Sequence, residues 1–496
     1  AEARFLEAFE LARKAHGDDS IILATSLANL ADIRVVLGKL DAAETDARRA
    51  IALIRKTLGR QHRKLIFPLT RLGEIEKRRG NISAAFEHFE AAAKLYEVVR
   101  QRGEAGGFGD NGAINSLIEA AFDVSATEAR EADNPYLAAA FRFSQLKTLT
   151  SASDALNKLG ARLGADNAEL RTLARERQDV ETAWTNADKT LLTAVSANPK
   201  TRDAKREAGL RAQILVYAKR LAALDDRLAK SFPQFAELSR PRPVTAADIQ
   251  AHLAGDEVLL QYLVTSRYIY GWAISKRGID WRRIELSRRD LRRAVQALRC
   301  GLDPTEWIGQ TKPARCFDLI GRFVEGPQLP FSTHHAHLLY DKLIKPFDAF
   351  LAGRKLLVVG SDALARLPLH LLLTAPVADD ASETLRNAPW LVRRHAITDY
   401  PSVSSFVILR GERTSAALQT AAAQRTRRPY FAVANPLLVG ADATNRSAFP
   451  VKGSPPATAR PAAEQVATAV GSLMTYFRGG KPDIKLLRRL ERLPET

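Results

Sequence analysis

The first hundred residues repeat with a period of 42, and this repeat constrains the fold more than any other feature of the chain. Small, apolar and glycine residues recur in register at that offset: Ala8, Ala50 and Ala92; Leu11, Leu53 and Leu95; Gly17 and Gly59; Leu27 and Leu69; Leu30 and Leu72; Ile33 and Ile75; Gly38 and Gly80; Ala43 and Ala85. The pattern predicts that each copy is a pair of helices joined by a tight turn. Because one pair cannot bury its apolar stripe alone, the copies are expected to stack into an α-solenoid.

The repeated unit resembles the tetratricopeptide repeat (TPR), in the long form found in kinesin light chains. The residues that carry the resemblance are Leu27, Leu30, Ala31, Gly38, Ala43 and Ala50. We expect residues 1–102 to contain two full copies and a preceding half. Since a solenoid normally needs three or more copies, further repeats are expected before Ala1.

By the same resemblance, the first helix of each pair lines a concave groove that takes a protein or peptide partner. Asn29 and Arg71 occupy equivalent positions of these helices, 42 residues apart. A side-chain amide or guanidinium in such a groove holds the backbone or a carboxylate of an extended peptide. Both residues are therefore candidate peptide-binding residues, with ordinary solvated helix surface as the alternative.

Helices are also predicted for residues 113–240, after a glycine-rich break at 103–112. Two long helices in this region are separated by a second break at 197–200, which predicts an antiparallel hairpin. The second long helix carries apolar residues at alternating steps of four and three, which is the heptad spacing of coiled coils: Leu210, Ile214, Tyr217, Leu221, Leu224 and Leu228. This stripe is predicted to be hairpin seam or core, with a recognition helix for another chain as the alternative.

The pattern changes to α/β from Glu257. Three short β-branched and aromatic segments predict an antiparallel meander at the edge of a sheet: 258–265, 268–275 and 279–284. An amphipathic helix at 338–347 then precedes a continuous apolar run at 356–359. Such a run is typical of a strand buried on both faces of a mainly parallel sheet. Further strands are expected at 394–399 and 430–434.

The order of these pieces resembles the CHAT family, in which a caspase-like cysteine peptidase domain is joined to tetratricopeptide repeats. The resemblance covers residues 245–496, and its more specific segments are 258–284, 298–303, 356–369, 401–402 and 433–436. It implies a bacterial protein whose catalytic histidine and cysteine stand in Ala-Thr-His-Gly and Ser-Ala-Cys type motifs. Neither motif occurs before Thr496. The domain is therefore expected to be incomplete, with the dyad downstream, and residues 1–496 are expected to have no peptidase activity.

Three other features look like sites and are interpreted as structural. His370 follows a predicted buried strand, but no cysteine stands at a comparable strand end, so a histidine of the core, or one that supports neighbouring side chains, is favoured. His334, His335 and His337 lack the spacing and the acid of a helical zinc site, and no metal is expected. The turn at 360–362 lacks the glycine pattern of a nucleotide-binding loop, and no cofactor is expected.

The only two cysteines, Cys300 and Cys316, are read as buried thiols, with a disulfide in an oxidising compartment as the alternative. Residues 301–333 are read as irregular. No signal peptide and no apolar run of membrane-spanning length is visible, so a cytoplasmic protein without membrane contact is expected. The net charge is +18, but basic residues are spread along the chain and mixed with acids. They indicate solvated surface rather than a specific nucleic-acid site.

The predicted fold class is α plus α/β, in three parts. A TPR α-solenoid at 1–102 and a helical region with a long hairpin at 113–240 precede an incomplete caspase-like α/β domain at 245–496. The leading hypothesis is that the repeats bind a partner while the complete domain cleaves proteins with a Cys/His dyad. A protein-interaction scaffold without catalysis is the alternative, and weak nucleic-acid association is a third. No oligomeric state is predicted.

Overall fold

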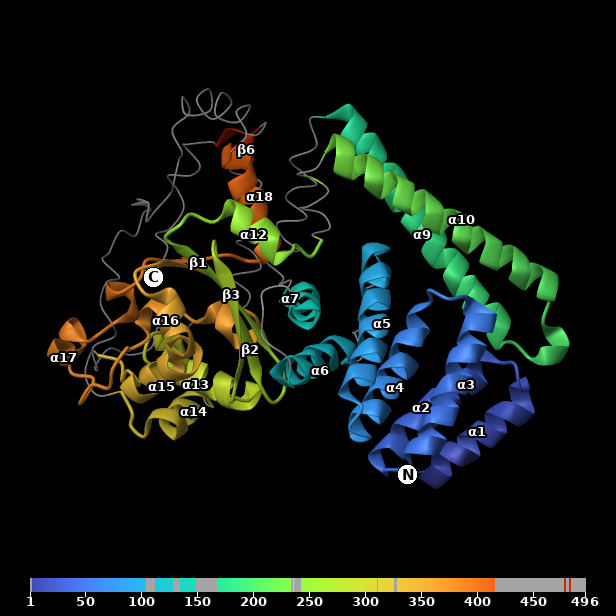
Figure 1. Ribbon diagram of the computed structural model, residues 1–496, viewed down its shortest axis with the longest axis horizontal. Coiled ribbons are helices and arrows are strands. Elements are labelled where there is room, and N and C mark those ends of the chain that lie inside the picture. The colour runs from blue at the N-terminus through green and yellow to red at the C-terminus, as the bar shows by residue number, and fades with distance from the viewer. Residues whose placement is uncertain are drawn as a thin grey trace, which may run out of the picture. The chain divides into compact units, whose positions relative to one another are not determined.

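Figure 1 shows the computed structural model, which describes residues 2–103, 112–127, 134–148, 167–232, 235, 242–309, 311–324, 328–414, 477–478 and 481–482. The chain divides into two compact units, Ala1–Ser415 and Ala416–Thr496. The described part of the second unit is a two-stranded antiparallel ribbon of β6 (Phe477–Arg478) and β7 (Lys481–Pro482). The strand predicted at 430–434 lies outside the described residues.

The amino-terminal repeats fold into helix pairs, as the 42-residue period predicts. The helices are α1 (Glu2–His16), α2 (Ile21–Val36), α3 (Leu40–Leu58), α4 (Ile66–Arg78) and α5 (Ile82–Gln101). Gly38 and Gly80 form the turns within the two full pairs with φ of +75° and +84°, in the left-handed region that glycine favours. The alanines expected at close helix contacts are fully buried: Ala43, Ala50, Ala85 and Ala92.

Two further helices, α6 (Ala113–Thr127) and α7 (Pro135–Thr148), continue this array. α6 packs against α5, and α7 packs against α6. Phe122 of α6 and Phe141 of α7 lie in one hydrophobic cluster with Trp272 of the sheet described below. The helix array and the α/β region therefore share a core.

The long helices α9 (Ala168–Ser196) and α10 (Ala204–Ser231) form the predicted hairpin, drawn in green in Figure 1. The short 3-10 turn η3 (Pro199–Thr201) joins them at the predicted break. Asn167 and Asp203 cap the two helices, because each side chain accepts a hydrogen bond from a backbone N–H of the first turn. Three of the predicted seam residues are fully buried: Leu221, Leu224 and Leu228.

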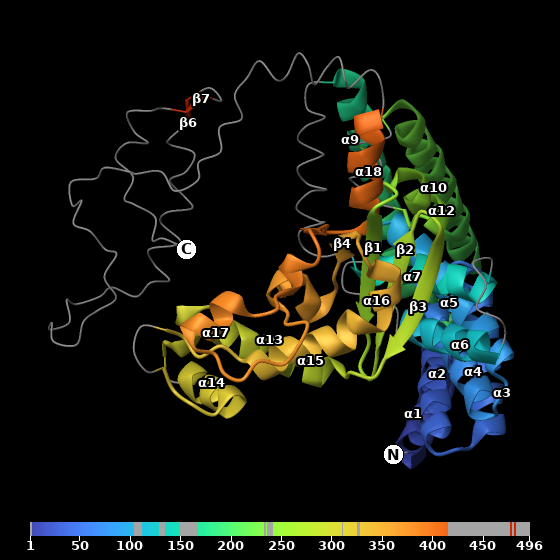
Figure 2. The same cartoon turned by 60° about the vertical axis from the view of Figure 1, so that its left-hand side comes forward.

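The α/β region is built on a five-stranded sheet with the strand order β3-β2-β1-β4-β5 (Figure 2). Its strands are β1 (Glu257–Val264), β2 (Ile269–Ser275), β3 (Gly278–Ile284), β4 (Lys355–Val359) and β5 (Ile397–Asp399). β1, β2 and β3 form the predicted antiparallel meander, and β4 and β5 continue the sheet parallel to β1. The parallel pairing of β1 with β4 needs a long crossover, and this crossover supplies helices for one face.

Helices cover both faces of the sheet, and the residues of β1 alternate between the two cores. Val258 and Leu260 belong to the cluster that includes α13 (Arg288–Cys300) and α15 (Thr333–Leu343). Leu259 instead belongs to the cluster of α6 and α7. Because successive side chains of a strand point to opposite faces, this two-sided burial explains the almost continuous apolar sequences of β1 and β4.

The remaining helices begin where the sequence predicts. α12 (Ala246–His252) starts in a capping box in which Thr245 and Asp248 each accept the other's backbone N–H, and Ser287 caps α13. The amphipathic face predicted before β4 is fully buried at Leu339, Leu343, Ile344 and Phe347. The shorter helices are α16 (Asp348–Leu351), α17 (Ser382–Asn387) and α18 (Val403–Thr414).

Several predictions for the α/β region are wrong in detail. Residues 301–333 are not irregular, because η4 (Pro304–Trp307) and α14 (Lys312–Ile320) fold there. Cys300 and Cys316 are not free thiols but form a disulfide. The strand predicted at 394–399 pairs only over the three residues of β5. Among the described residues, no helix is long and apolar enough to cross a membrane.

Candidate functional site

The first helices of the repeat pairs, α2 and α4, lie side by side and carry the two predicted peptide-binding residues. Asn29 is exposed on α2. Arg71 on α4 donates a hydrogen bond from Nη1 to Asp32 of α2, and its guanidinium lies 5.2 Å from the centre of the Phe67 ring. Sequence reasoning missed Asp32, although it lies one turn after Asn29 on the same helix.

Polar contacts between neighbouring first helices continue from α4 to α6. Ser116 of α6 donates to Glu74 of α4 at 2.9 Å, and Lys77 of α4 pairs with Glu119 of α6 at 3.1 Å. The face formed by α2, α4 and α6, which we call the inner face, is therefore polar, with acids and bases that compensate one another. The Arg71 side chain is 19% exposed, and its Nε atom is buried without a hydrogen-bond partner among the described residues.

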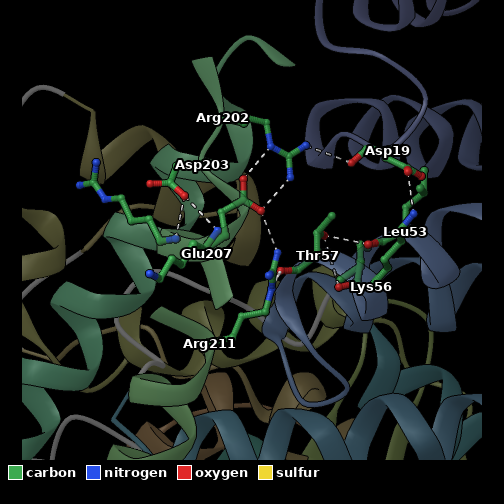
Figure 3. Close-up of polar contacts among 11 residues, drawn as sticks. Asp19, Leu53, Lys56, Thr57, Arg202, Asp203, Glu207 and Arg211 are labelled. Carbon is green, nitrogen blue, oxygen red and sulfur yellow. Dashed lines mark hydrogen bonds and ion pairs between the residues drawn. The ribbon is translucent and has the colours of Figure 1, made fainter. Parts of the chain in front are cut away.

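The tip of the α9–α10 hairpin is fixed to the turns between repeat pairs by a compact ionic cluster (Figure 3). Arg202 donates to both oxygens of Glu207 at 2.7 and 2.8 Å, and Arg211 donates to the same carboxylate at 3.0 Å. Arg211 also donates from Nε to the backbone carbonyl of Thr57 at 2.7 Å, and Arg202 reaches the carbonyl of Asp19 at 3.5 Å. The hydrogen bond from Arg202 lowers the pKa of the Glu207 carboxyl below its usual value.

A second buried cluster fixes the middle of α9 to the turn after α3. The Nε2 atom of His62 lies 3.3 Å from Asp188 of α9, and its Nδ1 atom accepts the backbone N–H of Lys64 at 3.1 Å. Arg63 also pairs with Asp188, at 3.2 Å. Burial lowers the pKa of His62, and the Nδ1 acceptor role requires the neutral ring with its proton on Nε2.

Arg177 of α9 ties the hairpin to the end of α5. Its guanidinium donates to the backbone carbonyl of Gln101 at 2.9 Å and pairs with Asp225 and Glu181. Apolar residues of the same helix complete the contact, since Leu191 and Val195 are fully buried in the repeat core. The hairpin stripe is therefore core, as favoured from the sequence, and the hairpin runs along the turns that connect one repeat pair to the next.

The carboxyl end of β4 holds structural rather than catalytic side chains. Ser361 accepts the backbone N–H of Val264 at 3.0 Å and is buried. Asp362 has a left-handed φ of 53° and accepts two hydrogen bonds of 2.7 Å from Arg292. Both side chains at this turn are thus used in holding β1, β4 and α13 together, and neither is free to bind a phosphate.

His370 is exposed, so of the two structural roles expected for it, the core role is wrong. It lies in the 3-10 turn η7 (Leu369–Leu371), where Leu369 and the neighbouring Leu372 take the buried positions. In such a turn the residue between two buried positions points outward. No described cysteine is free to act as a nucleophile beside it, because the chain's two cysteines are bonded to each other.

The three histidines of α15 do not converge. His335 shares a hydrogen bond of 2.7 Å with Ser332, and His337 shares one of 3.0 Å with the carbonyl of Leu373. Over the described ranges of the chain, no group of three His, Cys, Asp or Glu side chains is placed to hold a metal ion.

Comparison with known proteins identifies the repeats. Residues 23–97 match the Tetratricopeptide repeat family, and this range spans α2 to α5. The match confirms the repeat prediction over these two helix pairs. No curated protein matches the sequence.

Proposed function

We propose that this chain is a protein-binding module whose inner face takes an extended segment of a partner protein. The observation that carries the proposal is the match of residues 23–97 to a repeat family that mediates protein–protein contacts. The exposed Asn29 and the partly exposed guanidinium side chain of Arg71 support it. The hydrogen bonds from the hairpin to the repeats go to backbone carbonyls at Asp19, Thr57 and Gln101, and not to Asn29 or Arg71.

The chemistry of this face favours a partner segment with a carboxylate. Arg71 is already oriented by Asp32 and by the Phe67 ring, so it loses little conformational entropy on binding. An incoming carboxylate competes with Asp32 and gains a charge-assisted hydrogen bond. Asn29 supplies a donor and an acceptor for the peptide backbone.

An array of extended peptides with free or amidated carboxyl termini tests the proposal. We expect the full chain to bind members with a free carboxylate, and Arg71→Met to weaken this binding roughly tenfold or more, the usual effect of a lost hydrogen bond to a charged group. Arg48→Met is the matched control, because Arg48 pairs with Glu44 on the second helix of the pair. Equal loss in both variants, or no preference for carboxylates, would reject this site.

For the α/β region we propose the scaffold part of a caspase-like CHAT domain. Support comes from the parallel trio β1, β4 and β5 with helices on both faces. In the complete domain a histidine downstream of Thr496 would activate a cysteine, whose thiolate attacks the peptide carbonyl while backbone N–H groups stabilise the oxyanion. A scaffold without catalysis is the alternative.

The coding sequence beyond Thr496 distinguishes the two. A His-Gly after one predicted strand and a cysteine at the end of the next, about 50 residues on, would support the peptidase. If either is missing, the scaffold is supported. For residues 1–496 we expect no hydrolysis of fluorogenic peptides ending in Arg, Lys or Asp. Hydrolysis that stops on mutation of Cys300 or Cys316 would contradict this.

A further inference from the structure

The disulfide between Cys300 and Cys316 joins the last residue of α13 to the middle of α14. We propose that it is a redox-operated clasp, which holds α14 on the body of the protein when oxidised and lets α14 detach when a dithiol reductant opens it. The two Cα atoms are 5.7 Å apart, within the range usual for disulfides. The chain has no other cysteine, so no alternative pairing competes.

The burial of α14 shows why its docking depends on the bridge. Cys316 is the only buried residue of this helix. Phe317 and Phe323 stack on each other with ring centres 4.5 Å apart, but remain 38% and 54% exposed. A helix that buries one side chain gains little from apolar packing, and here that side chain is half of the disulfide.

The broad contacts of α14 are made with the two elements that precede it in the chain. The elements that contact it broadly are α13 and η4. Beyond the loop, Asp380 fixes the chain again: its carboxylate pairs with Arg322 and accepts the backbone N–H of Phe331 at 2.8 Å, and its carbonyl accepts Gln328 at 2.7 Å. The described residues between Cys300 and Arg322 therefore lie between the disulfide on one side and the Asp380 contacts on the other.

A buried carboxylate supplies a further attachment. Glu306 of η4 pairs with Arg299 of α13 at 3.1 Å and with Arg315 of α14 at 2.6 Å, and accepts Gln296 at 3.0 Å. Trp307 donates from Nε1 to the carbonyl of Cys300 at 2.6 Å. These contacts guide α14 to its position in the oxidised protein. After reduction, the Glu306 and Trp307 contacts must hold α14 in place without the covalent bond. They must then offset the conformational entropy that the opened loop would gain by releasing the helix.

The redox step balances as an ordinary thiol–disulfide exchange. A thiolate of the reductant attacks one sulfur, the bond between Cys300 and Cys316 breaks, and the second thiol of the reductant resolves the mixed disulfide. Two electrons and two protons pass to the protein, which then carries two thiols, and the reductant becomes a disulfide. Because both sulfurs are fully buried, attack requires a transient opening of α14.

Hydrogen exchange on the full chain, with and without dithiothreitol, tests the clasp. We expect peptides covering 312–324 to exchange up to about 100-fold faster after reduction, the effect estimated for opening a loop of about 15 residues. Peptides of α15 should keep their rates. Cys300→Ser/Cys316→Ser should exchange at the reduced rate with or without reductant, which shows that the change comes from this bond.

Mass spectrometry of the non-reduced chain is run beside the exchange experiment. A mass two hydrogens below that of the reduced chain supports the bond. The proposal is overturned if air-oxidised protein retains two alkylatable thiols. It is also overturned if oxidised and reduced chains, both shown folded by circular dichroism, exchange equally over 312–324. Tryptic cleavage after Arg315 and Arg322 gives an independent measure of the same opening.

Discussion

Gly73 of α4 lies directly against the ring of Phe89 of α5, and a Cβ atom placed on Gly73 would be 2.4 Å from Phe89 Cε1. In the first repeat, the equivalent positions 42 residues earlier both hold a small side chain: Ala31 and Ala47. Both alanines are fully buried. The two repeats therefore fill the same helix contact with different volumes, a small pair in one copy and a glycine with a large ring in the other.

We expect Gly73→Ala to destabilise the protein by about 1–3 kcal/mol, although alanine is the better helix former. The ring of Phe89 is fully buried and cannot move aside without opening the α4–α5 contact. Thermal unfolding of the purified variant measures the change.

Gly209→Ala is the matched control, because Gly209 is also in a helix but a Cβ atom there would meet nothing within 4 Å. This variant should be neutral or stabilised by up to about 1 kcal/mol. If Gly73→Ala were equally stabilising, the close approach of α4 to Phe89 would be wrong.

The hairpin attachment gives a second prediction. Glu207→Gln removes the charge that holds Arg202 and Arg211, and leaves both guanidinium groups without their carboxylate. We expect a loss of about 1.5–3 kcal/mol in unfolding free energy, as for hydrogen bonds to charged groups. Glu176→Gln serves as control. Its pair with Arg220 is 34% and 52% exposed and should contribute less than about 1 kcal/mol.

The pH dependence of this loss has a definite sign. Arg202 lowers the pKa of Glu207 below 4.5 in the folded state, so the contribution is complete above about pH 4.5 and disappears as pH falls through the folded pKa. The stability difference between the wild-type protein and Glu207→Gln should therefore shrink between about pH 4.5 and 3. A difference that is constant across this range would show that the carboxylate is not what holds the hairpin tip.

Much of this architecture is readable from local sequence. The 42-residue period, the break before Lys200, the caps at Thr245 and Ser287 and the alternation in β1 all depend on neighbouring residues, and the structure follows them. The heptad spacing of α10 likewise predicted that its apolar side chains are buried, but not which part of the chain the hairpin packs against. The position of the hairpin depends on the hydrogen bond from Arg211 to the backbone carbonyl of Thr57, and no side-chain pattern in the sequence predicts this bond.

The site was predictable only in part, for similar reasons. Helical position gave the exposure of Asn29, and the same spacing would have shown Asp32 as a neighbour of the inner face. The exposure of His370 could not be predicted from the sequence, because the chain forms a 3-10 turn at 369–371, where a buried segment was expected. The disulfide requires that α14 forms. Because α14 buries a single residue, its sequence has almost no apolar periodicity from which a helix could be predicted.

Buried His62 provides a third prediction: its pKa is lowered like that of Glu207, but the form that the fold favours is neutral rather than charged. Burial lowers the pKa of His62 below 6.5, so the unfolded chain takes up the proton first. Stability is complete above about pH 6.5, falls as pH decreases toward the folded pKa, and levels off below it, with a slope of up to about 1.4 kcal/mol per pH unit. Urea unfolding at pH 7.5, 6.5, 5.5 and 4.5 measures the profile.

His62→Asn should remove this pH dependence while keeping the cap, because an Asn oxygen can accept the N–H of Lys64 as the imidazole Nδ1 does. Its stability at neutral pH should fall, since the contact with Asp188 is lost. His370→Asn, at an exposed position, should leave the profile unchanged. A profile of His62→Asn that still follows the wild-type between pH 6.5 and 5.5 would assign the transition to another group.

The last prediction concerns the face of the sheet that α6 and α7 cover. Tyr270, Trp272 and Trp281 are buried there against aromatic residues of the helix array, with Trp272 and Trp281 stacked at 5.8 Å. A fragment of residues 245–414 lacks these helices and exposes the aromatic face, which exceeds what a soluble monomer normally shows. We expect it to aggregate and to bind a hydrophobic dye.

A fragment of residues 112–414 restores α6 and α7 and is the matched comparison. Light scattering after size exclusion should give a smaller aggregated fraction for it than for 245–414, and dye binding should fall in parallel. The longer fragment still lacks α5 and the other repeat helices, so some apolar surface of α6 and the α9 residues Leu191 and Val195 stay uncovered, and its recovery should be incomplete. If 245–414 were a monodisperse monomer with cooperative unfolding, the aromatic layer between helix array and sheet would not be needed for the fold. The α/β region would then be independent of the repeats, and the shared core would be a docking contact between two separately stable parts.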